Sequence, residues 1–491
     1  MSSTSPQTQA PTAIVWFRQD LRLEDNPALT AAIQNGFRIL PVFILDDENA
    51  GAWKRGGASR WWLHKSLESL NRSLNDKMIF CVGKADEILP NLVHDNGASA
   101  VFWNRCYEPW RIARDTKIKD TLKSGGIDVH TFNASLLWEP WEIKKSDGTP
   151  YKVFTPFYRK GCLEHSTPAL PVSAPALKDI RFADAAERNL PYAGALDSLA
   201  LMPSIEWYSE MDTLWQPGES GAHATLEQFL NHGLKGYKEE RNRPDKENVS
   251  RLSPYLHFGE ISPRAVWHRA QTAGLAQGLE KDTDHFCSEL GWREFSYSLL
   301  YYNPDMMRKP LQTKFENFPW DRNDAALAAW QKGLTGIPIV DAGMRQLWRT
   351  GWMHNRVRMI VASVLIKNML LHWHHGEDWF WDTLIDADLA NNAASWQWVA
   401  GCGADAAPYF RIFNPITQGE KFDPDGAYIR AFVPELADMP KQYIHKPWEA
   451  GPLILREAGV TLGESYPLPI VDLKKSRDAA LEAFQSLKTA A

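Results

Sequence analysis

The fold of the N-terminal part is indicated by the stretch AIVWFRQDLR, residues 13–22. Its first half, 13–17, is a short apolar run rich in β-branched and aromatic residues, which is typical of a buried strand. Similar runs follow at 38–45, 78–82, 100–103 and 129–132. Helical patterns such as 59–74 lie between them. Strands that alternate with helices over short links predict a Rossmann-like α/β domain with a parallel sheet.

The polar residues 18–22 follow the first strand without a G-x-G-x-x-G pattern, which argues against a standard dinucleotide site there. Prolines recur and periodicity is poor over 136–217, which predicts a long linker. Apolar residues then recur at helical spacing, for example over 263–272, 286–302 and 355–372. We therefore expect four parts: a disordered tail (1–12), the α/β domain (13–135), the linker (136–217) and an all-α domain (218–491).

The composition is that of a folded protein, with 44% hydrophobic and 23% charged residues among 491. No stretch approaches the ~20 apolar residues of a membrane span, and the polar N-terminus does not resemble a secretory signal. The five cysteines are scattered and form no C-x-x-C pair, which favours a reducing, cytoplasmic compartment. A net charge of −6 neither indicates nor excludes nucleic-acid binding, which depends on local charge. The 22 tryptophans are an excess that packing, stacking or redox relays could explain.

Four segments combine residue types that suit a ligand site. A basic segment with interleaved tyrosines, 235–264, contains small hydroxyls at 250 and 253 that suit a phosphate; the alternative is a solvated basic face. Glu289 and Trp292 share one face of a helix, as do Asn355 and Met359. Each pair could hydrogen-bond and pack against a flat heterocycle, or could be an ordinary mixed face. The stretch 386–398 holds acids, amides and tryptophans among small residues, which suits a cofactor loop.

A histidine cluster, HWHH at 372–375, could suggest a metal. Adjacent histidines on a helix point in different directions, and no cysteine or second histidine cluster accompanies them. We therefore expect no metal site.

Taken together, the chain resembles the DNA photolyase/cryptochrome family. The resemblance runs through nearly the whole chain after the tail, and six blocks in the same order make it specific. These are IVWFRQDLR with DNP (14–22, 25–27), SRLS (250–253), WREF (292–295), GWMHN (351–355), ASWQW (394–398) and RIFNP (411–415).

The resemblance implies an α/β antenna domain, a long linker and a helical domain that holds FAD, reduced in the active form. It implies cofactor contacts at Tyr237, Ser250, Arg251, Leu252, Ser253, Arg293, Arg358, Asp386, Asp388 and Asn392. Arg358 would pair with Asp386, and Asn392 would face the flavin. Val249 departs from the family pattern, in which threonine is frequent. The resemblance also implies that Trp396, Trp373 and Trp320 carry electrons between the flavin and the surface.

The residues at the dimer-facing positions are similar to those of class I cyclobutane pyrimidine dimer photolyases. These positions are Glu289, Trp292, Asn355, Met359 and Trp398, which would be catalytic. Histidines expected for repair of (6-4) lesions are missing at 355 and 359. Arg241, Trp292, Arg356 and Arg411 would contact UV-damaged DNA, from which the dimer flips into the pocket. The alternative is a blue-light cryptochrome without repair; a nucleotide-binding protein sharing only the α/β domain is more distant.

The segment 104–111 matches neither the folate-binding nor the deazaflavin-binding pattern, with Cys106, Trp110 and Arg111 at the differing positions. A second antenna chromophore could be a folate, a deazaflavin, another flavin, or absent. The resemblance further implies a monomer without a membrane partner, located in the cytoplasm and on the nucleoid.

Overall fold

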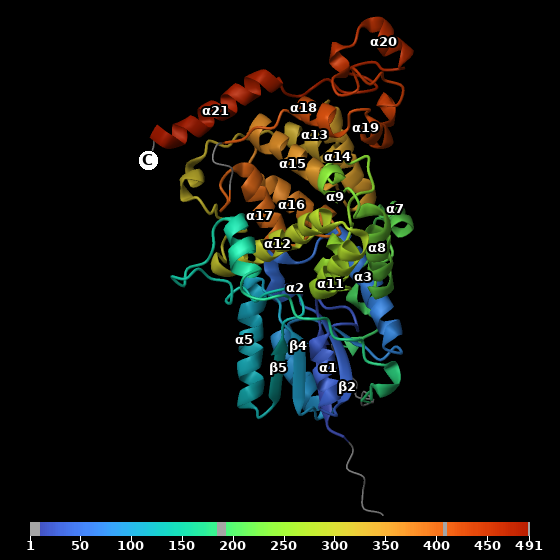
Figure 1. Ribbon diagram of the computed structural model, residues 1–491, viewed down its shortest axis with the longest axis vertical. Coiled ribbons are helices and arrows are strands. Elements are labelled where there is room, and N and C mark those ends of the chain that lie inside the picture. Colours follow the sequence, from blue (N-terminus) through green and yellow to red (C-terminus); the bar gives the residue numbers. More distant parts are fainter. Residues whose placement is uncertain (1–9, 184–192, 406–409, 490–491) are drawn as a thin grey trace, which may run out of the picture.

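The computed structural model describes residues 10–183, 193–405 and 410–489. A sheet with flanking helices occupies one end of the molecule, and a larger group of helices occupies the other (Figure 1). The expected tail lies, over residues 1–9, outside the described residues.

The sheet has six strands in the order β5-β4-β1-β2-β3-β6. Their bounds are β1 Thr12–Phe17, β2 Arg38–Leu45, β3 Ile79–Val82, β4 Ala100–Asn104, β5 Asp128–Phe132 and β6 Ala193–Gly194. The first five strands are parallel, as expected, and β6 is antiparallel to β3. All six residues of β1 are buried because helices cover both faces of the sheet. The strand order reverses between β1 and β4, where α/β folds place their ligands.

The side chains of β1 alternate between the two faces of the sheet and pack into different apolar cores. Ile14 and Trp16 pack with residues of helix α4 (Ala85–Asn96) on one face. Val15 and Phe17 face a larger core that continues through helix α3 (Gly57–Ser73) into the helical part of the chain. This continuity joins the two parts through apolar contacts. The other helices of this part are α1 Pro27–Gln34, α2 Asp47–Ala50, α5 Pro109–Ser124 and α6 Phe154–Pro156.

The predicted linker contributes to the core over part of its length. Leu136, Trp138, Phe157 and Tyr158 are buried, the last two in the π-helical turn η2 (Phe157–Cys162). The interpretation of 136–217 as a connector over the surface is therefore wrong for these residues, whose large apolar side chains need burial.

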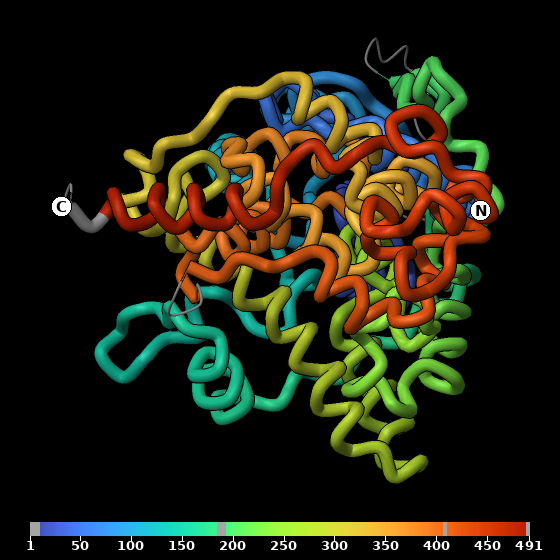
Figure 2. The backbone as a smooth tube through the Cα atoms, turned by 90° about the horizontal axis from the view of Figure 1, so that it is seen from above, coloured from blue at the N-terminus to red at the C-terminus, as the bar shows by residue number. Residues whose placement is uncertain are grey.

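The remaining chain is helical, as predicted. Its helices are α7 Ser209–Leu214, α8 Glu219–Gln228, α9 Tyr237–Glu240, α10 Ser253–Phe258, α11 Pro263–Gln277, α12 Glu280–Tyr302, α13 Asp324–Lys332, α14 Pro338–Thr350, α15 Asn355–Ser363, α16 Trp373–Thr383, α17 Leu389–Ala400, α18 Pro415–Phe422, α19 Ala427–Phe432, α20 Pro452–Glu457 and α21 Leu473–Thr489. Helix α21 runs along the outside of this part (Figure 2). None of the described helices is both long enough and apolar enough to cross a membrane.

One long helix predicted over 355–372 is wrong. Helix α15 ends at Ser363 and continues as the π-helical turn η7 (Val364–Asn368). Leu370 then adopts a left-handed conformation, with φ 54°, which ends the helical path before α16 begins. Apolar spacing did not reveal this break because buried residues continue through it.

Candidate functional site

Asp386 is the centre of a polar cluster formed by three segments of the helical part. Its Oδ2 accepts hydrogen bonds from Ser253 Oγ at 2.6 Å and from Arg358 Nη2 at 2.8 Å. The ion pair expected between Arg358 and Asp386 is therefore present. The other oxygen, Oδ1, is buried and has no hydrogen-bond partner among the described residues. A buried acceptor of this kind is available to a donor from a ligand or from water.

Asp388 lies two residues further on and caps helix α17. Its Oδ1 accepts the Asn391 N–H at 2.9 Å. Its Oδ2 accepts the Tyr297 hydroxyl at 2.5 Å and lies 3.3 Å from His257 Nδ1. Burial alone would raise the pKa of Asp388, but the hydrogen bonds from His257 and Tyr297 hold it well below its usual range. The carboxylate is therefore ionised and fixed in orientation.

Asn392 is buried one turn into α17. Its Nδ2 donates to the backbone oxygen of Glu377 at 3.0 Å, which fixes the orientation of the amide. Arg293, by contrast, donates to Ser135 O at 2.6 Å and lies over the Tyr297 ring. The first contact joins α12 to Ser135, the last residue of the predicted α/β domain.

The segment 250–253 has an unusual backbone. Arg251 adopts φ 51°, a conformation that costs energy for a residue with a Cβ atom, and its guanidinium lies over the Trp352 ring. Ser250 Oγ accepts the Leu252 N–H at 3.4 Å. Tyr237 is buried between Phe229 and Phe286. Strain at a polar, partly exposed segment is typical of a ligand-binding position.

These residues fit FAD chemically. The isoalloxazine ring of FAD carries an N–H group that can donate a hydrogen bond to Asp386 Oδ1, which has no partner among the described residues. The negatively charged diphosphate of FAD can pair with the Arg251 guanidinium. Asn392 and Asp388 offer further fixed polar groups.

A second cluster lies around Glu289 on α12. Arg241 Nη2 is 2.8 Å from Glu289 Oε2. Burial raises the pKa of Glu289, and Arg241 opposes that shift. The charge of Arg241 is therefore partly neutralised by Glu289, and its guanidinium is less available to bind a DNA phosphate.

Trp292 lies one turn further along α12. Its ring stacks on that of Phe154, with ring centres 3.8 Å apart and an angle of 12° between the planes. Phe154 belongs to α6 in the predicted linker, so the linker supports this tryptophan. Asn355 is exposed at the start of α15, whereas Met359 and Trp398 are half-buried on α15 and α17. That these residues enclose one dimer pocket stays a prediction.

The predicted DNA-contacting arginines gather at one place. Arg356 Nη2 donates to Asn242 Oδ1 at 2.8 Å, and its guanidinium lies over the Phe422 ring. Burial, with repulsion from Arg241 and Arg411, lowers the pKa of Arg356 to about 10. Three arginines near enough to repel one another form a local basic surface on a chain of net charge −6.

The three tryptophans of the expected electron relay differ in exposure. Trp396 on α17 is 2% exposed and Trp373 at the start of α16 is 1% exposed, whereas Trp320 is half-buried. This gradient is compatible with a path from the interior to the surface.

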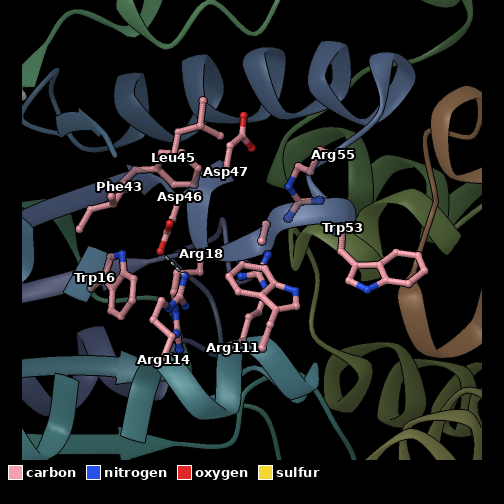
Figure 3. A pocket seen from close by; sticks show the side chains of 13 residues that line it. Trp16, Arg18, Phe43, Leu45, Asp46, Asp47, Trp53, Arg55, Arg111 and Arg114 are labelled. Atoms are coloured by element: carbon pink, nitrogen blue, oxygen red, sulfur yellow. Dashed lines mark hydrogen bonds and ion pairs between the residues drawn. The ribbon is translucent and has the colours of Figure 1, made fainter. Parts of the chain in front are cut away.

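The N-terminal part contains a pocket at the carboxyl end of the sheet (Figure 3). Trp16 and Arg55 lie at opposite ends of it, with Arg18, Arg111 and Arg114 between them. Carboxylates pair with the last three: Asp115 with Arg18 and Arg114, and Glu108 with Arg111.

Arg55 differs from the other arginines of this pocket. Its described neighbours include no carboxylate within ion-pair distance, and its Nη1 lies 2.9 Å from His257 Nε2. Burial lowers the pKa of Arg55 to about 10. The pocket therefore presents one uncompensated cation beside aromatic rings.

Four residues that contact the predicted site residues or line the pocket were not predicted from the sequence: Phe154, His257, Tyr297 and Arg55. Phe154 lies in a proline-rich segment that gave no periodic signal, and Arg55 comes before a helix with nothing distinctive beside it. His257 and Tyr297 look like ordinary helix residues, and only their contacts with Asp388 distinguish them.

Comparison with known proteins agrees with this geometry. The family model described as DNA photolyase matches residues 13–176, and the FAD binding domain of DNA photolyase matches 286–486. The deoxyribodipyrimidine photo-lyase of Agrobacterium fabrum is 48% identical over 97% of this chain and 98% of its own. Cryptochrome-1 of Arabidopsis thaliana is 38% identical, over 97% of this chain and 70% of its own. The chain belongs to the DNA photolyase/cryptochrome family.

Solved structures show the same similarity. A bacterial class III photolyase from Agrobacterium tumefaciens superposes with a TM-score of 0.93 at 47% identity, covering 99% of this chain and all of its own. An archaeal photolyase from Sulfolobus tokodaii, solved with two FAD molecules, has a TM-score of 0.81 at 30% identity, covering 97% of this chain and all of its own. The Agrobacterium tumefaciens structure is that of a class III photolyase, whereas the dimer-facing residues of this chain predict class I; both are photolyases.

Proposed function

We propose that this chain is a deoxyribodipyrimidine photo-lyase that uses light to split cyclobutane pyrimidine dimers in UV-damaged DNA. The observation that carries the proposal is the Glu289–Arg241 pair beside Trp292, in a helical part that also fixes Asp386, Asp388 and Asn392. A candidate dimer-binding surface and a candidate flavin-holding cluster in one domain support the proposal.

Reduced FAD, when bound and excited by light, supplies an electron that opens the cyclobutane ring and takes it back afterwards. Ser253 and Arg358 hold Asp386, which would bind the ring system, and Tyr237 and the segment 250–253 would bind the phosphates. Asn392, held by the Glu377 backbone oxygen, would bind the flavin ring.

The protein side of repair begins with binding of damaged DNA. Arg356 and Arg411 contact phosphates, and a damaged, poorly stacked dinucleotide flips out at lower cost than a normal one. Trp292 and Trp398 form apolar walls, and Met359 fills space against the bases. Glu289 and Asn355 hydrogen-bond the pyrimidine edges. Because burial favours the neutral form of Glu289, its carboxyl group can donate a hydrogen bond to charge that develops on the dimer.

We propose that Trp320, Trp373 and Trp396 pass electrons inward from the surface when the flavin is oxidised. Trp320 is half-buried, whereas Trp373 and Trp396 are 1% and 2% exposed, so the outermost member of the proposed path is the only one of the three that is partly exposed.

We assign the pocket at the carboxyl end of the sheet to a second, antenna chromophore. Aromatic walls and the uncompensated Arg55 suit a planar anionic molecule, which a folate, a deazaflavin or a flavin would satisfy. The Sulfolobus relative was solved with two FAD molecules, which supports a flavin among these. Chromatography of the chromophores released by heating the purified protein distinguishes them.

We propose further that the protein acts as a monomer in the cytoplasm, on the nucleoid, with damaged DNA as its partner and no membrane partner. The basic surface formed by Arg241, Arg356 and Arg411 supports the DNA contact.

The test uses purified, reduced protein and an oligonucleotide with one thymine cyclobutane dimer, under blue light and in the dark, with a (6-4) substrate in parallel. Loss of the cyclobutane dimer alone, and only in light, is the expected result. A protein that holds photoreducible FAD yet repairs neither lesion would instead be a signalling cryptochrome.

A further inference from the structure

The histidine cluster HWHH at 372–375 has no part in the function described above. Among the described residues, these histidines do not belong to a group whose ligand atoms converge as a metal requires. Histidines of this cluster contact two of the three relay tryptophans, Trp320 and Trp373, which points to a role in electron transfer rather than in metal binding.

His372 lies between Trp320 and Trp373. Its ring centre is 4.9 Å from that of Trp320, with the planes at 57°, and 5.7 Å from that of Trp373, with the planes at 26°. The imidazole is therefore in van der Waals range of both indoles. It forms an aromatic contact between the buried tryptophan and the half-buried one.

The orientation of this imidazole is fixed by its neighbours. His372 caps α16, with Nδ1 accepting the His374 N–H at 3.1 Å. The His374 ring lies 4.1 Å from the His372 ring and 4.1 Å, edge-on, from the Trp373 ring. The left-handed turn at Leu370 brings the chain into this arrangement.

The charged groups around His372 favour its neutral form. His374, His375 and Arg308 are its titratable neighbours, and all of them disfavour a further positive charge. Glu377 and Asp378 pair with Arg308, and Asp321 accepts the Arg322 N–H. Burial, followed by electrostatic repulsion from His374, His375 and Arg308, lowers the pKa of His372 to about 4, and burial lowers that of His374 to about 4.

We propose that the imidazole of His372 is the bridge through which an electron passes from Trp320 to oxidised Trp373, and that the bridge works only as an uncharged ring. The inference rests on the proposed function, since these tryptophans carry charge only in a photoactive flavoprotein.

The electron balance of this step is simple. Trp320 loses one electron, the radical cation of Trp373 gains it, and no bond forms or breaks. A thiol in solution then re-reduces Trp320. A neutral aromatic ring provides orbital contact across the gap, whereas an imidazolium would repel the positive charge that has to move outward past it.

The experiment compares the holoprotein with the His372→Leu, His372→Phe and His375→Leu variants. His375 is exposed and serves as the matched control. With oxidised flavin and a thiol present, flash absorption follows the tryptophan radicals, and continuous blue light follows the loss of oxidised flavin. Circular dichroism and bound FAD content verify folding of each variant.

We expect His372→Leu to slow radical formation at Trp320 by about tenfold or more, equal to ~1.4 kcal/mol in barrier. His372→Phe, which keeps a ring, should stay within a few-fold of the parent, and His375→Leu should match it. In the parent, the rate should fall as pH decreases through about 4, and in His372→Phe it should not. A leucine variant as fast as the parent, or a phenylalanine variant as slow as leucine, overturns the proposal.

Repair by the parent protein, reduced chemically with dithionite, separates the two proposals. That assay does not need electron flow through tryptophans. A parent that fails to repair contradicts the proposed function, while the radical measurement still tests His372 in the same protein.

Discussion

Glu289 is the residue at which burial and charge oppose each other most directly at the dimer-facing cluster. Burial raises its pKa, and Arg241 at 2.8 Å counteracts part of that rise. The balance leaves a carboxyl group that can share a proton with a ligand while remaining oriented by a cation.

The Glu289→Gln variant tests this proton sharing. Glutamine keeps a hydrogen bond to the dimer but has no acidic proton, and proton-sharing groups contribute on the order of 10²–10⁴-fold to reactions they assist. We expect the repair quantum yield to fall by about tenfold or more. In the parent, the yield should also decline as pH rises through the raised pKa of Glu289, because the proton is then lost.

Glu280→Gln, on the exposed first turn of the same helix, is the control and should repair normally. An unchanged yield in Glu289→Gln would make a proton-sharing role untenable.

Phe154 shows how a residue outside every motif supports the site. Its stacking on Trp292 fixes the orientation of this tryptophan, which we propose faces a flipped dimer. An aromatic pair of this kind contributes about 0.5–1.5 kcal/mol beyond its buried area.

We therefore expect Phe154→Ala to weaken binding of dimer-containing DNA by roughly threefold to tenfold, equal to about 1 kcal/mol. Fluorescence anisotropy with damaged and undamaged oligonucleotides measures this change. Tyr301→Ala, which removes a ring in tilted contact with Trp141 instead, controls for general loss of aromatic contacts. Equal loss of affinity in both variants would show that the Phe154–Trp292 stack has no specific role.

Among the elements, α15 illustrates how a helix end serves both stability and the site. His354 caps this helix, with Nδ1 accepting the Arg356 N–H at 3.2 Å. The same cap positions Asn355, Arg356 and Arg358 at the first turns of the helix. Burial, followed by the nearby cations Arg241 and Arg356, lowers the pKa of His354 to about 3.

The depressed pKa predicts acid sensitivity. The unfolded chain binds a proton at His354 below about 6.5, while the folded protein does not until about 3. The stability from this residue is therefore complete above pH 6.5 and decreases as pH falls toward 3, by about 2 kcal/mol between pH 7 and pH 5.

His354→Asn keeps an acceptor at the cap and removes the titration. Chemical denaturation measures the unfolding free energy of both proteins at pH 7 and at pH 5. The loss of unfolding free energy from pH 7 to pH 5 should be about 2 kcal/mol smaller in this variant than in the parent. The exposed His94→Asn variant should behave like the parent. A parent with the same stability at both pH values would contradict the prediction.

At the scale of the whole molecule, the local basic surface and the overall acidity of the chain act together. A net charge of −6 repels nucleic acid at long range, so we expect binding to depend on Arg356 and Arg411, which lie near the Glu289-paired Arg241. Affinity for DNA should therefore be strongly sensitive to salt.

Arg356→Gln should reduce the magnitude of the slope of log K against log salt by about 0.9, the value for loss of one phosphate contact. Titrations of a duplex at several salt concentrations measure the slope. Arg72→Gln, an exposed cation on α3 in the N-terminal part, should leave it unchanged. An unchanged slope in Arg356→Gln would remove Arg356 from the DNA interface.

The amino-acid sequence by itself determined the five parallel strands and the helical second part. Apolar runs of 4–8 residues and helical periodicity are local signals, and they depend little on distant contacts. Ordered motifs were enough to identify the family, and the Arg358–Asp386 pair was expected from them and is present.

Only the tertiary structure decided the contacts between segments far apart in the chain. Phe154 meets Trp292, Arg55 meets His257, and Arg241 meets Glu289 across separations that local patterns do not encode. The break at Leu370 and the burial of 136–138 also depend on which neighbours are available, because buried apolar residues look alike in any element. The physical reason is that packing and desolvation depend on the whole fold, whereas periodicity is local.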